Sequence, residues 1–317
     1  MQGASIGVNY GMIGAYLPQP SDVVSLYKRE NIPLMRLFEP KAEVLEALKG
    51  SGIKVALGIR NEDVPSLASN VNLAMEWVNN NVAPYAEDVN FGWITLGNEM
   101  VPGEGSELIP IAMNNILSGL NGAGLTGIKV STVVSSVVLG ETYPPSAGNF
   151  TSEAAGPMTG IIEWLAGTNN PILFNVYPYF AYVASPDKIP LGYALFNTDQ
   201  PVIDGEHEYH SLFEAMVDAF YAALEKTGGS KLTVAVSETG WPTAGNEPRT
   251  SKLNAQTYNQ NLINEMKQRG TPRRPDDILD IFIFSMFNED EKPAGVEQHW
   301  GIHYANMDPV YILTFQG

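Results

Sequence analysis

Eight short, strand-like runs recur along the 317 residues of the chain, and they constrain its fold more than any other feature. In order, they are Ile6 to Tyr10, Leu34 to Phe38, Lys54 to Ile59, Phe91 to Leu96, Ile128 to Val134, Ile172 to Tyr177, Leu232 to Val236 and Leu279 to Phe284. Several runs are almost continuously apolar, as expected for parallel strands that are covered on both faces. We therefore predict eight buried parallel strands.

Segments with helical spacing separate these strands. The two clearest sets of regularly spaced apolar residues are Phe213, Val217, Phe220 and Leu224, and Leu108, Ala112, Ile116 and Leu120. Glycines at Gly50 and Gly228 mark predicted helix ends before the third and seventh strands. Eight alternating units close most simply into a single (β/α)8 TIM barrel domain spanning residues 1–317.

An open doubly wound sheet is the rival architecture, and it usually carries a glycine-rich phosphate-binding turn after its first strand. Gly7, Gly11 and Gly14 do not match the G-x-G-x-x-G pattern of that turn. The barrel is therefore the preferred fold class. After the fifth strand, the polar stretch Gly140 to Gly156 is expected to form a long loop.

The charge balance excludes some classes of partner. With 18 basic and 35 acidic residues, the formal net charge is −17, which disfavours binding to nucleic acid and to anionic membrane surfaces. No apolar stretch reaches the roughly 18 residues that a membrane-spanning helix needs. The chain contains no cysteine, so disulfides and thiolate metal ligands are excluded. We expect a monomer that binds neutral ligands.

Three further segments bear on cellular location and metal binding. The N-terminal residues 1–5 lack the basic and apolar parts of a signal peptide, so we expect that a targeting segment is missing from the sequence. Asn149-Phe150-Thr151 is an N-glycosylation acceptor triplet, which fits an exported protein, although such triplets also arise by chance. His207-Glu208-Tyr209-His210 does not match H-E-x-x-H, so we predict a solvated loop at a helix start, and neither a metal site nor a cofactor.

Two glutamates follow buried strands. Glu99 ends the fourth predicted strand and Glu238 ends the seventh. A carboxylate at this position is costly unless it opens into a cleft, and catalytic groups of barrel enzymes sit at that end of the strands. Paired carboxylates are typical of glycosidic bond cleavage, with separations of about 5 to 5.5 Å for retention and roughly 6.5 to 9.5 Å for inversion. The alternative is a structural ion pair at the rim of the barrel.

Five motifs match one family in order and spacing, across almost the whole chain. They are Ile6-Gly7-Val8-Asn9-Tyr10-Gly11, Gly97-Asn98-Glu99, Asn175-Val176-Tyr177-Pro178-Tyr179-Phe180, Ser237-Glu238-Thr239-Gly240-Trp241-Pro242 and Met286-Phe287-Asn288-Glu289. On these motifs the chain resembles the family 17 glycoside hydrolases, the plant endo-1,3-β-glucanases. The resemblance implies a retaining mechanism in which Glu99 is the acid/base and Glu238 is the nucleophile.

The resemblance also implies supporting roles. Asn98 matches a position expected to bind the sugar 2-hydroxyl, and Tyr177 matches one that orients the nucleophile. Glu289, Lys292 and Glu297 match a charged cluster beside the acid, where Coulomb interactions would set protonation states. Without the match, an ordinary solvated loop is the preferred interpretation of Glu289 to Lys292.

Substrate contacts are expected from side chains near the strand ends. Flat rings at Tyr10, Tyr177, Phe180, Phe287 and Trp300 could cover glucose units, and we expect two or three of them to touch substrate. Asn175 and Trp241 lie in the matching motifs and complete the set. The chain departs from many relatives at Phe38-Glu39-Pro40-Lys41, where Tyr-Asp-Pro-Asn is common, so Phe38 is a weaker contact that lacks a hydroxyl.

These features predict an endo-acting hydrolase that cuts internal β-1,3-glucosidic bonds of glucans such as laminarin or fungal wall glucan. Three alternatives stay open: a 1,3;1,4-β-glucanase, a glucanosyltransferase, and a carbohydrate-binding barrel with little turnover. The resemblance further implies a protein secreted to the cell wall space, with a part in plant defence.

Overall fold

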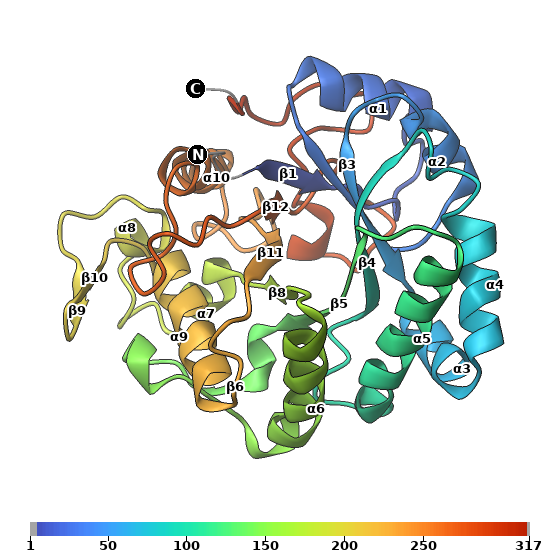
Figure 1. The fold of residues 1–317 in the computed structure, drawn as a ribbon. Coiled ribbons are helices and arrows are strands. Elements are labelled where there is room, and N and C mark those ends of the chain that lie inside the picture. The colour runs from blue at the N-terminus through green and yellow to red at the C-terminus, as the bar shows by residue number, and fades with distance from the viewer. Residues whose placement is uncertain (1–4, 316–317) are drawn as a thin grey trace.

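Eight parallel strands close into a barrel in the computed structural model, which describes residues 5–315. The signal-peptide expectation concerns residues 1–5, and residues 1–4 lie outside this range. The barrel order is β1-β12-β11-β8-β5-β4-β3-β2, and Figure 1 shows helices surrounding these strands. Their bounds are β1 Ile6–Asn9, β2 Leu34–Leu37, β3 Lys54–Ile59, β4 Asn90–Asn98, β5 Lys129–Ser135, β8 Ile172–Asn175, β11 Val234–Thr239 and β12 Ile281–Ile283.

The eight predicted strands are the eight strands of the barrel, and the predicted fold class is confirmed. Two strands extend further than expected at the functional end, where β4 continues to Asn98 and β11 to Thr239. Tyr10, Phe38 and Tyr177 instead lie just beyond their strands. All of these residues are at the carboxyl ends of the strands, which meet at one end of a barrel.

Helices follow seven of the eight barrel strands, whereas in the described part of the chain no α-helix follows β12. Their bounds are α1 Pro20–Arg29, α2 Ala42–Leu48, α3 Val64–Ser69, α4 Val71–Asn81, α5 Ile109–Gly122, α6 Ser152–Thr168, α7 Pro178–Ala184, α8 Leu191–Ala194, α9 Leu212–Lys226 and α10 Lys252–Met266. Helix α9 ends as its sequence predicts, because Gly228 has φ +87° and the Gly229 N–H donates to the Leu224 carbonyl at 2.7 Å. This pairing is the Schellman arrangement, which favours glycine at the left-handed position.

The inside of the barrel is filled by one apolar side chain from each of seven strands. These residues are Leu34, Ala56, Trp93, Val133, Leu173, Ala235 and Phe282. The eighth strand, β1, contributes Gly7, where a Cβ atom would lie 2.3 Å from the Leu34 Cβ. Trp93 and Phe282 meet edge to face with ring centroids 6.0 Å apart. The interior is therefore a packed core, and a ligand can reach the barrel only at its ends.

The predicted loop from Gly140 to Gly156 is partly wrong. Strands β6 Leu139–Glu141 and β7 Asn149–Phe150 form an antiparallel pair there, and α6 already begins at Ser152. Helix α6 starts early because the Thr151 hydroxyl caps it, accepting the Ala154 N–H at 3.1 Å. Asn149 of the glycosylation triplet is exposed on this ribbon.

The sequence predicts a loop for the segment His207 to His210, but its first three residues form a strand. Strand β10 His207–Tyr209 pairs with β9 Val202–Asp204 in a hairpin that projects from the barrel (Figure 1). Within residues 5–315, no group of three or more His, Cys, Asp or Glu side chains could hold a metal ion. No described helix is long and apolar enough to cross a membrane.

Candidate active site

Glu99 leaves strand β4 through an irregular turn. The pairing of β4 with β5 shifts register between Leu96 and Asn98, and Gly97 within the shift has φ +68°. Glu99 itself has φ +56°, a left-handed conformation that is uncommon for a residue with a Cβ atom. Its N–H still donates to the Val133 carbonyl at 2.9 Å. The turn therefore projects Glu99 away from the strand while its backbone stays bonded to β5.

Glu238 belongs to strand β11, whose pairing with β8 shifts register between Val236 and Glu238. The residue is only 7% exposed. Its Oε1 accepts a hydrogen bond from Arg36 Nη1 at 2.6 Å, and its Oε2 accepts one from the Tyr177 hydroxyl at 2.7 Å. Two donors thus fix both oxygens of this carboxylate.

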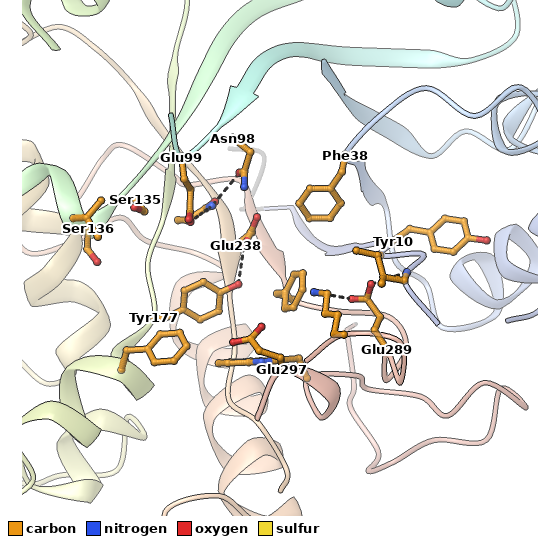
Figure 2. Close-up of a pocket in the computed structure, with 18 of the residues that line it drawn as sticks. Tyr10, Phe38, Asn98, Glu99, Ser135, Ser136, Tyr177, Glu238, Glu289 and Glu297 are labelled. Carbon is orange, nitrogen blue, oxygen red and sulfur yellow. Dashed lines mark hydrogen bonds and ion pairs between the residues drawn. The ribbon is translucent and has the colours of Figure 1, made fainter. Parts of the chain in front are cut away.

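Both glutamates line one cleft of about 1010 Å³ at the carboxyl ends of the strands. Figure 2 shows Glu99 and Glu238 close to each other, with Tyr177 bonded to Glu238. The other predicted site residues that line this cleft are Tyr10, Phe38, Asn98, Asn175, Tyr177, Phe180, Glu289, Lys292, Glu297 and Trp300. The structure therefore brings together residues that are as much as 290 positions apart, from Tyr10 to Trp300.

A hydrogen-bond network joins the two glutamates. Asn175 Nδ2 donates to Glu99 Oε1 at 2.8 Å and to Asn98 Oδ1 at 3.2 Å. Asn98 Oδ1 also accepts from Arg36 Nη2 at 2.9 Å, and the same guanidinium reaches Glu238. Ser237 Oγ donates to Asn175 Oδ1 at 2.6 Å, which fixes the orientation of that amide. The side chains between the two carboxylates are thus held in one arrangement.

The surroundings of Glu99 favour its protonated form. Desolvation is the largest cause that raises its pKa, and the negative charges of Glu238 and Glu297 raise it further. The hydrogen bond from Asn175 and the charge of Arg36 oppose this rise without cancelling it. Burial and the charge of Glu238 raise the pKa of Tyr177 well above its usual range, so this hydroxyl remains a donor.

Glu289 and Lys292 form an ion pair at 3.2 Å on the wall of the cleft. Glu289 is 3% exposed, and its Oε2 accepts the Ile13 N–H at 2.9 Å. A Cβ atom on Gly11 would meet the Glu289 carboxylate, so a larger residue there would have to displace this ion-paired group. An ordinary solvated loop, the alternative considered from the sequence, therefore does not describe Glu289.

The model of one protein family, described as glycosyl hydrolases family 17, matches residues 6–315. The chain belongs to this family. The resemblance read from the short motifs is thereby confirmed, and the protein is a glycoside hydrolase.

Individual relatives of this family 17 chain match 98% of its length. The putative glucan endo-1,3-beta-glucosidase GVI of Hordeum vulgare is 47% identical over 98% of this chain and 97% of its own. Lichenase-2 of Hordeum vulgare is 46% identical over 98% of both chains. A solved structure from work on two plant beta-glucan endohydrolases with distinct substrate specificities is 45% identical, with a TM-score of 0.94 over 98% of this chain and 100% of that one.

Two predicted substrate contacts of the family 17 chain need correction. Trp241 and Phe287 are both 0% exposed and do not line the cleft. Trp241 instead donates its indole N–H to the Arg249 carbonyl at 3.0 Å, and Phe287 packs edge to face against Tyr10. Phe287 thus supports the Tyr10 ring of the cleft, whereas Trp241 packs against Tyr179, which lies behind the cleft wall and contacts Phe180 and Trp300. Phe284, absent from the predicted set, does line it.

Arg36 is the most important site residue that the sequence interpretation omits. It is 1% exposed, lies in the middle of β2, and contacts both Glu238 and Asn98. A signal for it was present, because Arg36 is the single charged residue in the apolar run Leu34 to Phe38. A buried charge needs a partner of opposite sign, so an arginine in such a run indicates a buried carboxylate nearby.

Proposed function

We propose that this family 17 enzyme is an endo-hydrolase of internal β-1,3-glucosidic bonds that acts with net retention. Glu99 is the acid/base and Glu238 is the nucleophile. The observation that carries the assignment is that one cleft holds two carboxyl groups in opposite settings. Desolvation favours a proton on Glu99, whereas Glu238 is paired with Arg36. Such divergence is how glycosidases separate an acid from a nucleophile.

The reaction proceeds in two displacements. Glu99 gives its proton to the glycosidic oxygen as that bond breaks, while a Glu238 oxygen bonds to the anomeric carbon and forms a glycosyl-enzyme. Glu99, now ionised, removes a proton from water, which attacks the same carbon and releases Glu238. Arg36 and the Tyr177 hydroxyl hold the attacking carboxylate in place between the two steps.

The remaining cleft residues bind the sugar chain in this proposal. Asn98 Oδ1 accepts two hydrogen bonds from Arg36 and Asn175, so its amide N–H groups are the ones oriented for the sugar 2-hydroxyl. Phe180, 45% exposed, offers the most accessible ring. The other contacts are Tyr10, Phe38, Asn175, Tyr177, Glu297 and Trp300, all of which line the cleft.

Glu289 and Lys292 act on catalysis indirectly. Lys292 Nζ lies over the Phe284 ring, 4.4 Å from its centroid, and its partner Glu289 bonds to the first barrel loop. The pair thus connects the segment after β12 to the segment after β1 across the cleft wall. We propose that it keeps these walls in place beside the reacting sugar.

Linear 1,3-glucan is the proposed substrate, and mixed 1,3;1,4-glucan is the second candidate. The relative named Lichenase-2 supports the second, since its identity of 46% nearly equals the 47% of the relative named a glucan endo-1,3-beta-glucosidase. Overall identity therefore does not separate the two linkages. Parallel assays on laminarin and on mixed-linkage glucan do so, because the proposal expects a higher kcat/KM on laminarin.

The decisive assay compares the parent with Glu238→Ala on laminarin. Removal of a covalent nucleophile lowers the rate by several orders of magnitude, so the variant should release almost no reducing ends. Equal activity in both proteins would contradict the assignment. Binding without cleavage by the parent would instead identify a carbohydrate-binding barrel, and products longer than the substrate would identify a glucanosyltransferase.

Export as a monomer to the cell wall space, and a part in plant defence, also remain proposals. The exposed Asn149 in the only N-x-S/T acceptor triplet of the chain supports passage through a secretory pathway. Intact mass after expression in a plant secretory system tests this. We expect the parent to carry a glycan that is absent from Asn149→Gln. A parent without any glycan would remove this argument for passage through a secretory pathway.

A further inference from the structure

The backbone of Asn98, next to Glu99, has an unusual partner on one side. Strands β3 and β4 pair in constant register from Ala56 and Trp93 to Ile59 and Leu96, where that ladder ends. On the other side of β4, the pairing with β5 shifts register between Leu96 and Asn98. Beyond the end of the β3–β4 ladder, the Asn98 N–H donates to Asn61 Oδ1 at 2.7 Å, and Asn61 Nδ2 donates to the Asn98 carbonyl at 3.0 Å. A carboxamide has one acceptor group and one donor group, as a peptide does. Asn61 therefore adds one more rung to the β3–β4 ladder with its side chain.

This rung lies where the chain makes its irregular turn. Glu99 has φ +56°, and a residue with a Cβ atom keeps such a conformation only where its surroundings fix it. On one side the Glu99 N–H is bonded to the Val133 carbonyl of β5 at 2.9 Å. On the other side, the two bonds from Asn61 hold the preceding peptide units. The turn is thus held between strand β5 and the segment that follows β3.

Asn61 acts without touching the cleft. Its neighbours Arg60 and Glu62 line the cleft, whereas Asn61 does not. Its two bonds both end on the main chain of Asn98, whose side chain in turn bonds to Arg36 and Asn175. Any influence of Asn61 on the reaction therefore passes through the placement of Asn98 and Glu99.

From this geometry we propose that Asn61 is a positioning residue for the general acid. By completing the ladder at Asn98 it fixes the turn that presents the Glu99 carboxyl group to the leaving oxygen. The inference rests on the proposed role of Glu99 and adds a residue outside the cleft to the catalytic geometry.

A purely structural role of Asn61 predicts a different kinetic effect from a positioning role. Two substrates that differ in their leaving group distinguish these roles. Laminarin needs a proton on its leaving oxygen, whereas 2,4-dinitrophenyl β-laminaribioside releases an acidic phenol that leaves without one. A misplaced acid should therefore slow the first substrate and spare the second. General damage to the fold or to sugar binding should slow both equally.

The test measures kcat/KM of Asn61→Ala on both substrates. On laminarin we expect a loss of about 10- to 100-fold, as a small misplacement of a reacting group produces. On the dinitrophenyl substrate we expect a change within about threefold, because acid assistance contributes little there. Glu99→Gln should show the same split with a larger loss on laminarin.

Asn115→Ala is the matched control. The Asn115 amide also bonds to backbone carbonyls of another element, Leu67 at 2.8 Å and Ala68 at 3.2 Å, but away from the cleft. This variant should retain parental kcat/KM on both substrates.

Equal losses of Asn61→Ala on the two substrates, or no loss on laminarin, would overturn the inference while leaving the role of Glu99 intact. If Glu99→Gln itself lost activity equally on both substrates, or the parent cleaved neither, the proposed function would fail and this inference with it.

Discussion

Arg36 Nη1 lies 2.6 Å from Glu238 Oε1, and both side chains are buried, with 1% and 9% of their surfaces exposed. The guanidinium also binds Asn98 Oδ1 at 2.9 Å. The buried Arg36 guanidinium thus positions two residues, the proposed nucleophile Glu238 and Asn98, which precedes the proposed acid.

Arg36→Met should destabilise the protein because it leaves Glu238 buried without a cation. Loss of one partner of a buried ion pair costs about 3–5 kcal/mol in the free energy of unfolding. Urea denaturation at pH 7 measures this cost. Arg36→Met combined with Glu238→Gln should recover part of it, since no unpaired charge remains, and a double variant no more stable than Arg36→Met would contradict this account.

Glu297→Gln should lower the pKa of the proposed acid. The negative charge of Glu297 is one of the causes that raise the pKa of Glu99, so its removal favours ionisation of Glu99 at lower pH. The basic limb of the kcat/KM profile on laminarin should therefore move to lower pH. Glu62→Gln, at another part of the cleft, serves as the control and should leave the limb in place. If the basic limb of Glu297→Gln moved to higher pH, the proposed effect of the Glu297 charge on Glu99 would be contradicted.

Phe38→Tyr should tighten substrate binding. The Phe38 ring lines the cleft with the Arg36 guanidinium 4.4 Å from its centroid, and it offers no hydroxyl to the sugar. One new hydrogen bond contributes about 0.5–1.5 kcal/mol, so KM for laminarin should fall about 2- to 10-fold with kcat little changed. Tyr16→Phe, which removes a hydroxyl at a 97% exposed position, is the control. An unchanged or raised KM for Phe38→Tyr would show that the missing hydroxyl is not a binding defect.

The buried carboxyl group of Asp218 on helix α9 should make the free energy of unfolding depend on pH. Burial is the main cause that raises its pKa from 3.8 to about 6, although the Arg273 N–H donates to its Oδ2 at 2.8 Å. As the pH rises through this interval the unfolded chain loses its proton first, so the free energy of unfolding falls by about 3 kcal/mol. This contribution is complete below pH 3.8 and lost above about pH 6.

Asp218→Asn should remove that part of the pH dependence and be more stable than the parent at pH 7. Denaturation curves at pH 4 and pH 7 provide the measurement. Asp276→Asn, at an exposed position, should behave as the parent does. If the free energy of unfolding changed equally between pH 4 and pH 7 in the parent and in Asp218→Asn, the proposed effect of burying Asp218 would be contradicted.

Much of the barrel could be predicted because buried parallel strands leave a strong mark on a sequence. The apolar runs and the glycines at helix ends predict all eight strands, and Glu99 and Glu238, near the carboxyl ends of β4 and β11, predict the position of the cleft. The structure of the segment after β5 could not be predicted. Strands β6 and β7 are too short to show the alternation of apolar and polar residues that marks a strand, and the helix cap at Thr151 depends on one hydrogen bond.

The parts of the site that escaped prediction depend on tertiary contacts. Whether an aromatic residue beside a motif faces the cleft or the core is decided by packing, so Trp241 and Phe287 could not be separated from Phe180 and Trp300 by position in the chain. Asn61 is an ordinary loop residue in the sequence, and only the register shift of β4 gives it a partner. Arg36, in contrast, could be predicted from the sequence, because it is the single charged residue in the apolar run Leu34 to Phe38.

The central step of the proposed mechanism is the bond that Glu238 forms to the anomeric carbon of the sugar. The most direct measurement is to incubate the enzyme with 2,4-dinitrophenyl 2-deoxy-2-fluoro-β-laminaribioside, whose fluorine slows breakdown of the glycosyl-enzyme, and to map the labelled peptide by mass spectrometry. The account predicts one fluoroglycosyl group per chain, attached to Glu238. A label on Glu99 or on any other residue, or rapid turnover without any label while products appear with inverted configuration, would contradict it.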